Sequence, residues 1–132
     1  MFRHSLPREH SLAADRRTIE AALKRFPAES GMCAPLARVV FAVAKPSDPA
    51  ATGLQVRARG TARFILTKHP AVHVWHSHTL VRTKAHHVDA LTGPAGCEVE
   101  EYLDVHWSHP EALEMLEVDV SAVDPGVQNV EE

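Results

Sequence analysis

The segment from Ala71 to Gly93 concentrates side chains that can carry chemistry. It reads AVHVWHSHTLVRTKAHHVDALTG and holds five of the ten histidines of the chain, together with Asp89. An imidazole can bind a metal ion or move a proton near neutral pH, and a carboxylate can orient that imidazole. Which role applies depends on a cysteine about forty residues upstream, in the stretch SGMCAPLARVVFAVAKP.

That cysteine, Cys33, lies where the sequence predicts the first turn of a helix. Ser30 is a candidate N-cap, and Pro35 is tolerated only near a first turn. The apolar stripe that follows has helical spacing and consists of Leu36, Val39, Val40 and Val43. At a helix start, amide N–H groups and the helix dipole favour the nucleophilic thiolate. Alternatively, Cys33 has no chemical role and is only a small apolar residue at the start of a helix.

The other elements predict an α+β fold in a single domain, residues 1–132, with residues 122–132 as a flexible acidic tail. Two N-terminal helices are expected, the first over 11–26 and the second starting close to Cys33. They would pack on an antiparallel meander of about four strands, predicted over 54–59, 61–67, 72–82 and 86–91.

A C-terminal helix is expected over 108–116, after a segment, 97–107, whose pattern fits either a helix or a strand. The reason is a capping box formed by Ser108 and Glu111, with Pro110 in the first turn.

Three short motifs resemble the transglutaminase-like branch of the papain-like cysteine enzymes. They are the cysteine at a helix start, HVW from His73 on one strand, and VDA around Asp89 on the next, within about residues 30–93. The resemblance implies a papain-like core with Cys33 as nucleophile, His73 as base and Asp89 as the acid that orients it. It also implies a hydrolase, or an acyl transferase, that acts on amide or related acyl bonds through a thioester without a metal or cofactor.

The sequence departs from the papain-type proteases in two ways. The stretch FPAESGM lacks the Gln that these enzymes place ahead of the cysteine, and the chain is short for a second lobe and a deep peptide cleft. Both departures argue against a general endopeptidase. A deamidase, a narrow peptidase or amidase, an acyl transferase and a toxin-like or effector-like domain stay open, with a protein, a peptide or a small amide as substrate.

Strand parity leaves the identity of the base open. In a continuous strand, His73 and Trp75 share one face, while His76 and His78 share the other. A three-residue loop before the next strand brings Asp89 to the face of His73, and a two-residue loop brings it to the other face. His76 is therefore the alternative base, and Trp75 is a candidate substrate contact.

Two other functions remain as alternatives. A zinc-binding protein would use His76 and His78 as ligands, completed by His87, Asp89 or a cysteine, although the sequence has neither a CxxC nor an HExxH motif. A non-catalytic interaction module with a histidine-rich surface is the other.

Charge and composition narrow the choice of partners and compartment. Residues 1–68 carry twelve Lys and Arg against five Asp and Glu, and residues 69–132 carry two against twelve, so the halves are expected to attract each other. Nucleic acid is not expected, because the basic half lacks stacking aromatic residues beyond scattered Phe. We see no signal peptide and no membrane span, which favours a cytoplasmic protein, with export by a route without a cleavable signal left open.

Cys33 should react with iodoacetamide well faster than Cys97 near neutral pH, because a helix start raises the thiolate fraction. Mass spectrometry after timed labelling measures both rates in one sample. Equal labelling of the two cysteines would count against a catalytic role for Cys33.

Overall fold

The structure is a computed structural model, which describes residues 5–28 and 32–123, with side chains from residue 15 onward. Its three α-helices are α1 (Ser5–Arg25), α2 (Cys33–Ala44) and α3 (Tyr102–His106). Its strands are β1 (Thr52–Ala58), β2 (Ile65–Leu66), β3 (Val74–Trp75), β4 (Ser77–Arg82), β5 (His86–Val88), β6 (Cys97–Glu98) and β7 (Leu113–Val118).

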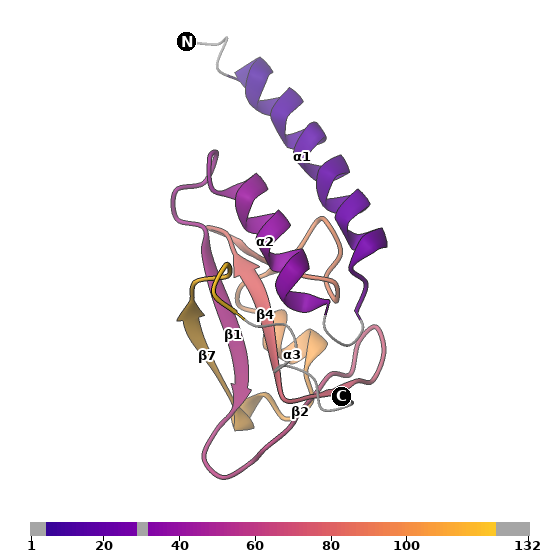
Figure 1. Cartoon of the computed structure of the whole chain (residues 1–132), viewed down its shortest axis with the longest axis vertical. Coiled ribbons are helices and arrows are strands. Elements are labelled where there is room, and N and C mark those ends of the chain that lie inside the picture. The colour runs from indigo at the N-terminus through magenta and orange to yellow at the C-terminus, as the bar shows by residue number, and fades with distance from the viewer. Residues whose placement is uncertain (1–4, 29–31, 124–132) are drawn as a thin grey trace.

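The main sheet has five antiparallel strands in the order β6-β5-β4-β1-β7, while β2 and β3 pair separately as a two-stranded ribbon. The α+β class and the antiparallel sheet predicted from the sequence are therefore confirmed. The simple meander is wrong, because the chain leaves the sheet after β1 and returns only at β4. The ribbon is the excursion between these two neighbouring strands (Figure 1).

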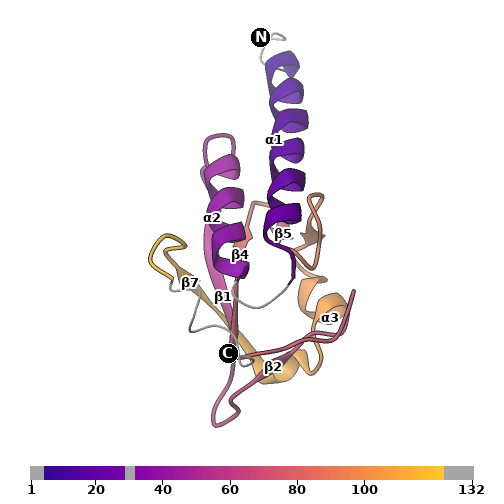
Figure 2. The same ribbon diagram turned by 45° about the vertical axis from the view of Figure 1, so that its right-hand side comes forward.

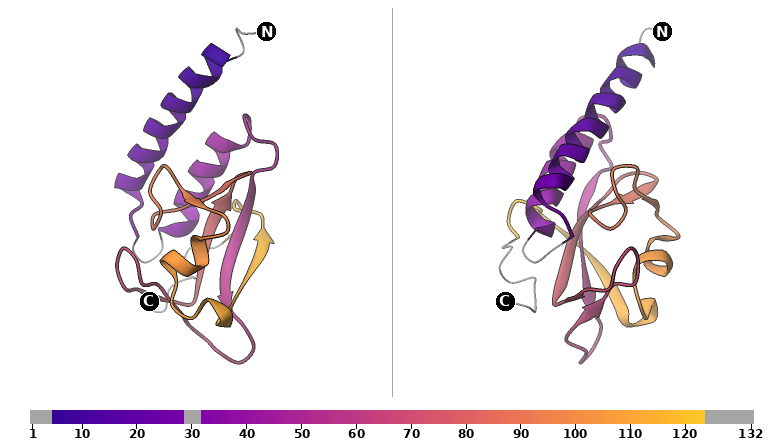
Figure 3. Two further views of the ribbon diagram at one scale, coloured as in Figure 1. Left: turned by 180° about the vertical axis from the view of Figure 1, so that it is seen from behind. Right: turned by 90° about the vertical axis from the view of Figure 1, so that its right-hand side faces the viewer.

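The sheet separates two hydrophobic cores. On one face, α1 and α2 lie side by side, and α2 packs on β4, with Val40, Val81 and Val88 among the buried residues (Figure 2). The second core, which contains Leu80, Trp75 and Trp107, lies between the other sheet face, the ribbon and α3 (Figure 3). The N-terminal part of α1 extends beyond the end of α2.

The start of α2 is where the proline and the apolar stripe predicted it. The helix begins at Cys33, after Met32 as N-cap residue, and no side chain of the described residues caps it. The predicted N-cap, Ser30, lies outside the described residues. Leu36 donates the first helical hydrogen bond, to the carbonyl of Met32. The first turn of α2 is therefore closed by a backbone hydrogen bond.

The predicted C-terminal helix is wrong. A single turn of 3-10 helix, Pro110–Ala112, is followed by β7, which pairs with β1 from Ala58↔Leu113 to Gly53↔Val118. The capping box does not form, because the amide of Ser108 donates to Leu66 of the ribbon. Pairing with the edge of β1 satisfies a whole row of backbone groups, which outweighs a local helix signal.

Two sequence-based expectations concern the chain ends and membranes. Most of the predicted acidic tail, residues 124–132, lies outside the described residues. Just before it, Arg38 of α2 donates from Nε to the carbonyl of Val120 (2.9 Å), which holds the end of the described chain against that helix. Among the described residues, no helix is both long and apolar enough to cross a membrane.

Gly53→Ala should destabilise the fold by about 1 to 3 kcal/mol, because overpacking forces the backbone to shift. A Cβ at Gly53 would lie 2.5 Å from Val120 Cγ1 and 2.6 Å from the carbonyl oxygen of Val118. Urea unfolding measures the change in the free energy of unfolding.

Gly60→Asn is the matched control for that substitution. Gly60 has a φ of 59°, and a Cβ added there would meet no atom of the described chain within 4 Å. Asn tolerates this left-handed conformation. An equal free energy of unfolding for Gly53→Ala and the native protein would contradict the register of β1 and β7.

Candidate active site

A fully buried carboxylate, Asp89, anchors the candidate site. The chain turns directly after β5, and Asp89 Oδ1 accepts hydrogen bonds from the amides of Leu91 (2.9 Å) and Thr92 (3.0 Å). Asp89 Oδ2 accepts from His78 Nε2 (2.8 Å) and from the hydroxyl of Tyr102. Both oxygens are thus satisfied by two donors each, as a buried carboxylate requires.

His78 is held in one orientation by the second core. It lies on β4 opposite Val56 and is 1 % exposed. Its imidazole stacks on Trp75 at a ring-centre distance of 5.0 Å and lies 5.5 Å from the ring of Trp107. With Nε2 committed to Asp89, the other ring nitrogen, Nδ1, is buried, and no nitrogen or oxygen of the described residues forms a hydrogen bond with it.

The thiol of Cys33 approaches the same imidazole from the start of α2. Cys33 is 9 % exposed, and its interaction with His78 is one of the contacts that favour the protonated ring. β5 pairs with β4 only at Val81 and Arg82, so the edge of β4 near His78 is left uncovered by β5. The start of α2 can therefore approach the imidazole along the part of β4 that β5 does not cover.

The site favours a charged His78–Asp89 pair at neutral pH. Burial acts to lower the pKa of His78, but its hydrogen bonds to Asp89 and Cys33 outweigh burial and raise this pKa from 6.5 to about 9. Burial likewise acts to raise the pKa of Asp89, yet the hydrogen bond and charge of His78 lower it below 3.8. A protonated imidazole next to a thiol is an arrangement suited to proton transfer.

The imidazole that contacts Asp89 belongs to neither of the two histidines considered as the base, His73 and His76. His73 is half-buried and stacks on the indole of Trp75 at 5.0 Å. His76, the alternative base, is exposed. Trp75, the candidate substrate contact, is 2 % exposed and supports His78 from within the core. The structure thus brings Cys33 and Asp89 to one site, as expected, but with His78 in place of His73.

Two local features explain the difference in histidine. Arg82 pairs with His87, so four residues separate the paired positions of the hairpin. An even number of loop residues places Asp89 on the face of His78, as the two-residue loop considered above would. In addition, a bend at His76 separates β3 from β4. Because of that bend, Trp75 and His78 stack although they belong to opposite faces of an uninterrupted strand.

Sequence reasoning missed Tyr102 and considered His87 as a ligand of the zinc alternative. Tyr102 is fully buried and donates a hydrogen bond to Asp89, and burial together with the charge of Asp89 raises the pKa of Tyr102 well above 10. His87 is 3 % exposed, and its ring lies 4.7 Å from that of Tyr102. Burial lowers the pKa of His87 to about 4, so this imidazole is neutral. The only hint in the sequence was that Tyr102 is the single tyrosine of the chain.

Cys97 lies in a different electrostatic environment from Cys33. Burial raises its pKa, and so do the negative charges of Glu101, Asp89 and Glu98. These charges disfavour the thiolate of Cys97, which agrees with the slow alkylation expected for it.

The zinc alternative requires a group of ligands that lie close together. In the part of the chain that the structure describes, no group of three His, Cys, Asp or Glu side chains could hold a metal ion. His76 is exposed, whereas His78 is buried on the other side of the bend.

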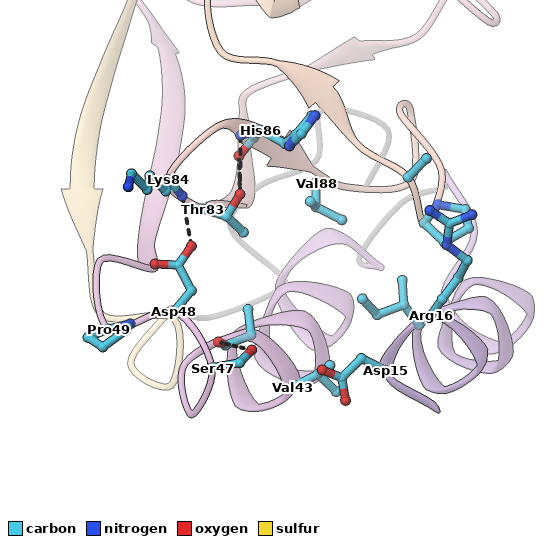
Figure 4. Close-up of a pocket in the computed structure, with 14 residues that line it drawn as sticks. Asp15, Arg16, Val43, Ser47, Asp48, Pro49, Thr83, Lys84, His86 and Val88 are labelled. Carbon is cyan, nitrogen blue, oxygen red and sulfur yellow. Dashed lines mark hydrogen bonds between the residues drawn. The ribbon is translucent and has the colours of Figure 1, made fainter. Parts of the chain in front are cut away.

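A large cavity of the described chain lies away from the candidate site. It has a volume of about 880 Å³ and lies between α1, the C-terminal end of α2 and the β4–β5 turn (Figure 4). Asp48 lines it and accepts a hydrogen bond from the amide of Lys84 (2.8 Å), and Arg16 and His86 line it as well. Cys33, His78 and Asp89 are not among its lining residues.

Comparisons with family models, with curated proteins and with solved structures find no match for this chain.

Asp89→Asn should lower the pKa of His78 from about 9 to below 6.5, because the ring stays buried but loses the carboxylate. An NMR titration of the imidazole Cε1–H signals measures this change. His86→Ala is the control, since His86 lines the cavity at the other end of the hairpin, and it should leave the titration of His78 unchanged. A His78 pKa that Asp89→Asn does not move would contradict the pair.

The same pair predicts how stability depends on pH. The raised pKa of His78 gives stability that is complete below pH 6.5 and lost as the pH rises through about 9. The lowered pKa of Asp89 gives stability that is present above pH 3.8 and lost on acidification. Asp89→Asn should therefore lower the free energy of unfolding most, by about 3 to 5 kcal/mol, near pH 5 to 6, and least near pH 9.

Proposed function

We propose that this protein is a cysteine-dependent enzyme that acts on an amide or related acyl bond through a thioester, with Cys33 as nucleophile. His78 moves the proton and Asp89 orients and stabilises the imidazole. The observation that carries the proposal is the buried imidazole, which contacts the carboxylate through Nε2 and also interacts with a helix-start thiol.

The charge distribution supports this assignment of roles. The contact with Cys33 raises the pKa of His78, so an imidazolium lies next to the thiol at neutral pH and would stabilise a thiolate there. The thiolate is the attacking form of cysteine, and the imidazolium is an acid ready to protonate a leaving group. Asp89 fixes the ring and stabilises its charge, with no need to accept the proton.

The first turn of α2 can stabilise the negative charge of the reaction intermediate. The amide of Ala34 lies in this first turn, directly after Cys33, and Pro35 has no N–H. Amides at a helix start can donate to the oxyanion that forms when a thiolate attacks a carbonyl. This arrangement needs no glutamine ahead of the cysteine.

The chemistry proceeds in two balanced steps. Attack of the Cys33 sulfur on the carbonyl carbon gives a tetrahedral intermediate, which collapses to a thioester as His78 gives its proton to the leaving amine. Water or an acceptor amine then attacks the thioester, and His78 takes the proton from it and restores the thiolate. With water the reaction is hydrolysis or deamidation, and with an amine it is acyl transfer.

The resemblance to the transglutaminase-like branch of the papain-like enzymes supports the same proposal. A helix that starts at the cysteine packs on an antiparallel sheet whose neighbouring strands β4 and β5 lead to the histidine and the acid. A papain-like core is part of this proposal, with His78 in the position that the motif HVW gave to His73. Protein, peptide or small amide substrates fit it.

His78→Gln and Asp89→Asn should each slow alkylation of Cys33 by iodoacetamide more than about tenfold at pH 7, because loss of the imidazolium removes the thiolate. His73→Gln is the matched control and should change the rate less than about twofold. Labelling is followed by mass spectrometry, and circular dichroism checks that each variant folds.

A second measurement tests acyl chemistry directly. The protein is incubated with a tryptic peptide library, quenched in acid and analysed by intact mass. An adduct on Cys33 that hydroxylamine removes, and that Cys33→Ser lacks, is the expected thioester. Absence of any adduct, together with equal alkylation rates in His78→Gln and the native protein, would refute the proposal.

A further inference from the structure

The ribbon of β2 and β3 turns an apolar face outward. Ile65 pairs with Trp75 and Leu66 with Val74, and Ile65 and Trp75 both point into the core. Alternation along each strand then places Leu66 and Val74 on the other side. We call these two residues, with the exposed flanking residues Phe64, Lys68 and Val72, the ribbon face.

The ribbon face is unusual because its apolar side chains are open to solvent. Phe64 is 53 % exposed, Val72 68 % and Val74 39 %, and these are three of the five exposed large hydrophobic residues in the described chain. A sheet face in contact with water is ordinarily polar, and a cluster of exposed apolar side chains marks an interaction surface.

The charged side chains of the ribbon are positive. Lys68 lies on the ribbon face and Arg63 precedes Phe64, and neither has an ion-pair partner among the described residues. The sequence contains no Asp or Glu from Pro49 to Val88. A partner with negative charge is therefore favoured, and the same charges would repel a second copy of this face.

The open edge of the ribbon favours an extended polypeptide over a lipid surface. In the described chain, β3 pairs with β2 alone, and the amide of Thr67 donates to the carbonyl of His73. The N–H and C=O of Val74 must then point away from β2, where an added strand can bond to them. Lipid headgroups cannot form such a ladder, and attraction to two cations is worth only about 1 kcal/mol each.

The ribbon is also continuous with the candidate active site. Trp75 on its inner side stacks on His78, and β3 runs through His76 directly into β4. A polypeptide bound along the ribbon would therefore lie next to the strand that carries the catalytic imidazole.

We propose that the ribbon face and its open edge dock an extended acidic segment with alternating apolar side chains, belonging to the protein on which Cys33 acts. The proposal rests on the proposed function for its identification of the partner as substrate. The apolar side chains pack on the ribbon face, and the acidic ones, which alternate to the other face of the added strand, are favoured by the overall positive charge of the ribbon.

Fluorescence anisotropy with a short fluorescein-labelled peptide of alternating Glu and Val tests the docking. The native protein should bind it, and the double variant Phe64→Ser/Val74→Ser and the variant Lys68→Glu should each weaken binding at least about tenfold, or about 1.4 kcal/mol. Leu116→Ser, which removes an exposed apolar side chain on β7, is the matched control and should bind as the native protein does. A Lys–Val peptide and a Glu–Ser peptide should both bind at least about tenfold more weakly.

Three results would overturn the proposal. One is no binding of the Glu–Val peptide, or equal binding by the ribbon variants. Another is sedimentation with phosphatidylserine vesicles that the ribbon variants abolish while the peptide does not bind, which would assign the face to a membrane. The third is a dimer in analytical ultracentrifugation that Phe64→Ser/Val74→Ser dissociates.

The outcome is separable from that of the proposed function. Cys33→Ala should bind the peptide unchanged, since docking needs no thiol. If the peptide binds but the alkylation rate of Cys33 does not depend on His78, the enzyme proposal fails and the docking proposal is supported. If Cys33 is activated and no peptide binds, the docking proposal alone fails.

Discussion

The carboxylate of Asp89 is the charge around which this protein is organised. A carboxylate that is 2 % exposed is tolerated only when donors replace its lost water, and here four do so. They come from β4, from the turn after β5 and from α3, so three separate segments must be in place at once. Misplacement of any one would leave buried charge unpaired, which links the geometry of the site to the stability of the fold.

The second core serves the same site from the other side. The rings of Trp75 and Trp107 confine the imidazole of His78, and Tyr102 confines the carboxylate. These aromatic side chains reach the site from β3 and from the region of α3, which are distant in sequence and meet only in the folded chain. The fold itself thereby holds the imidazole in one orientation, which is the preorganisation that the proposed proton transfer requires.

Local patterns predicted what depends on local structure, and contacts between distant segments decided the rest. Pro35 and the stripe after it located the start of α2 at Cys33, and the resemblance carried by the motif VDA pointed to Asp89 as the acid. The choice of His78 depended on a bend at His76 and on a hairpin register that parity left open. Residues 108–116 carried a helix signal, yet residues 113–118 pair with the edge of β1 as a strand. No local pattern marks Tyr102 as a donor.

The position of β1 between β4 and β7, inside the sheet, has a consequence for how the chain folds. Its two neighbours, β4 and β7, both follow it in the sequence, and β7 is the last strand that the described chain contains. During synthesis β1 therefore emerges with both edges unpaired, and one of them stays open until nearly all of the described chain has been made. We expect nascent chains of this protein to fold late and to need chaperones, since a strand with unpaired edges is a template for aggregation.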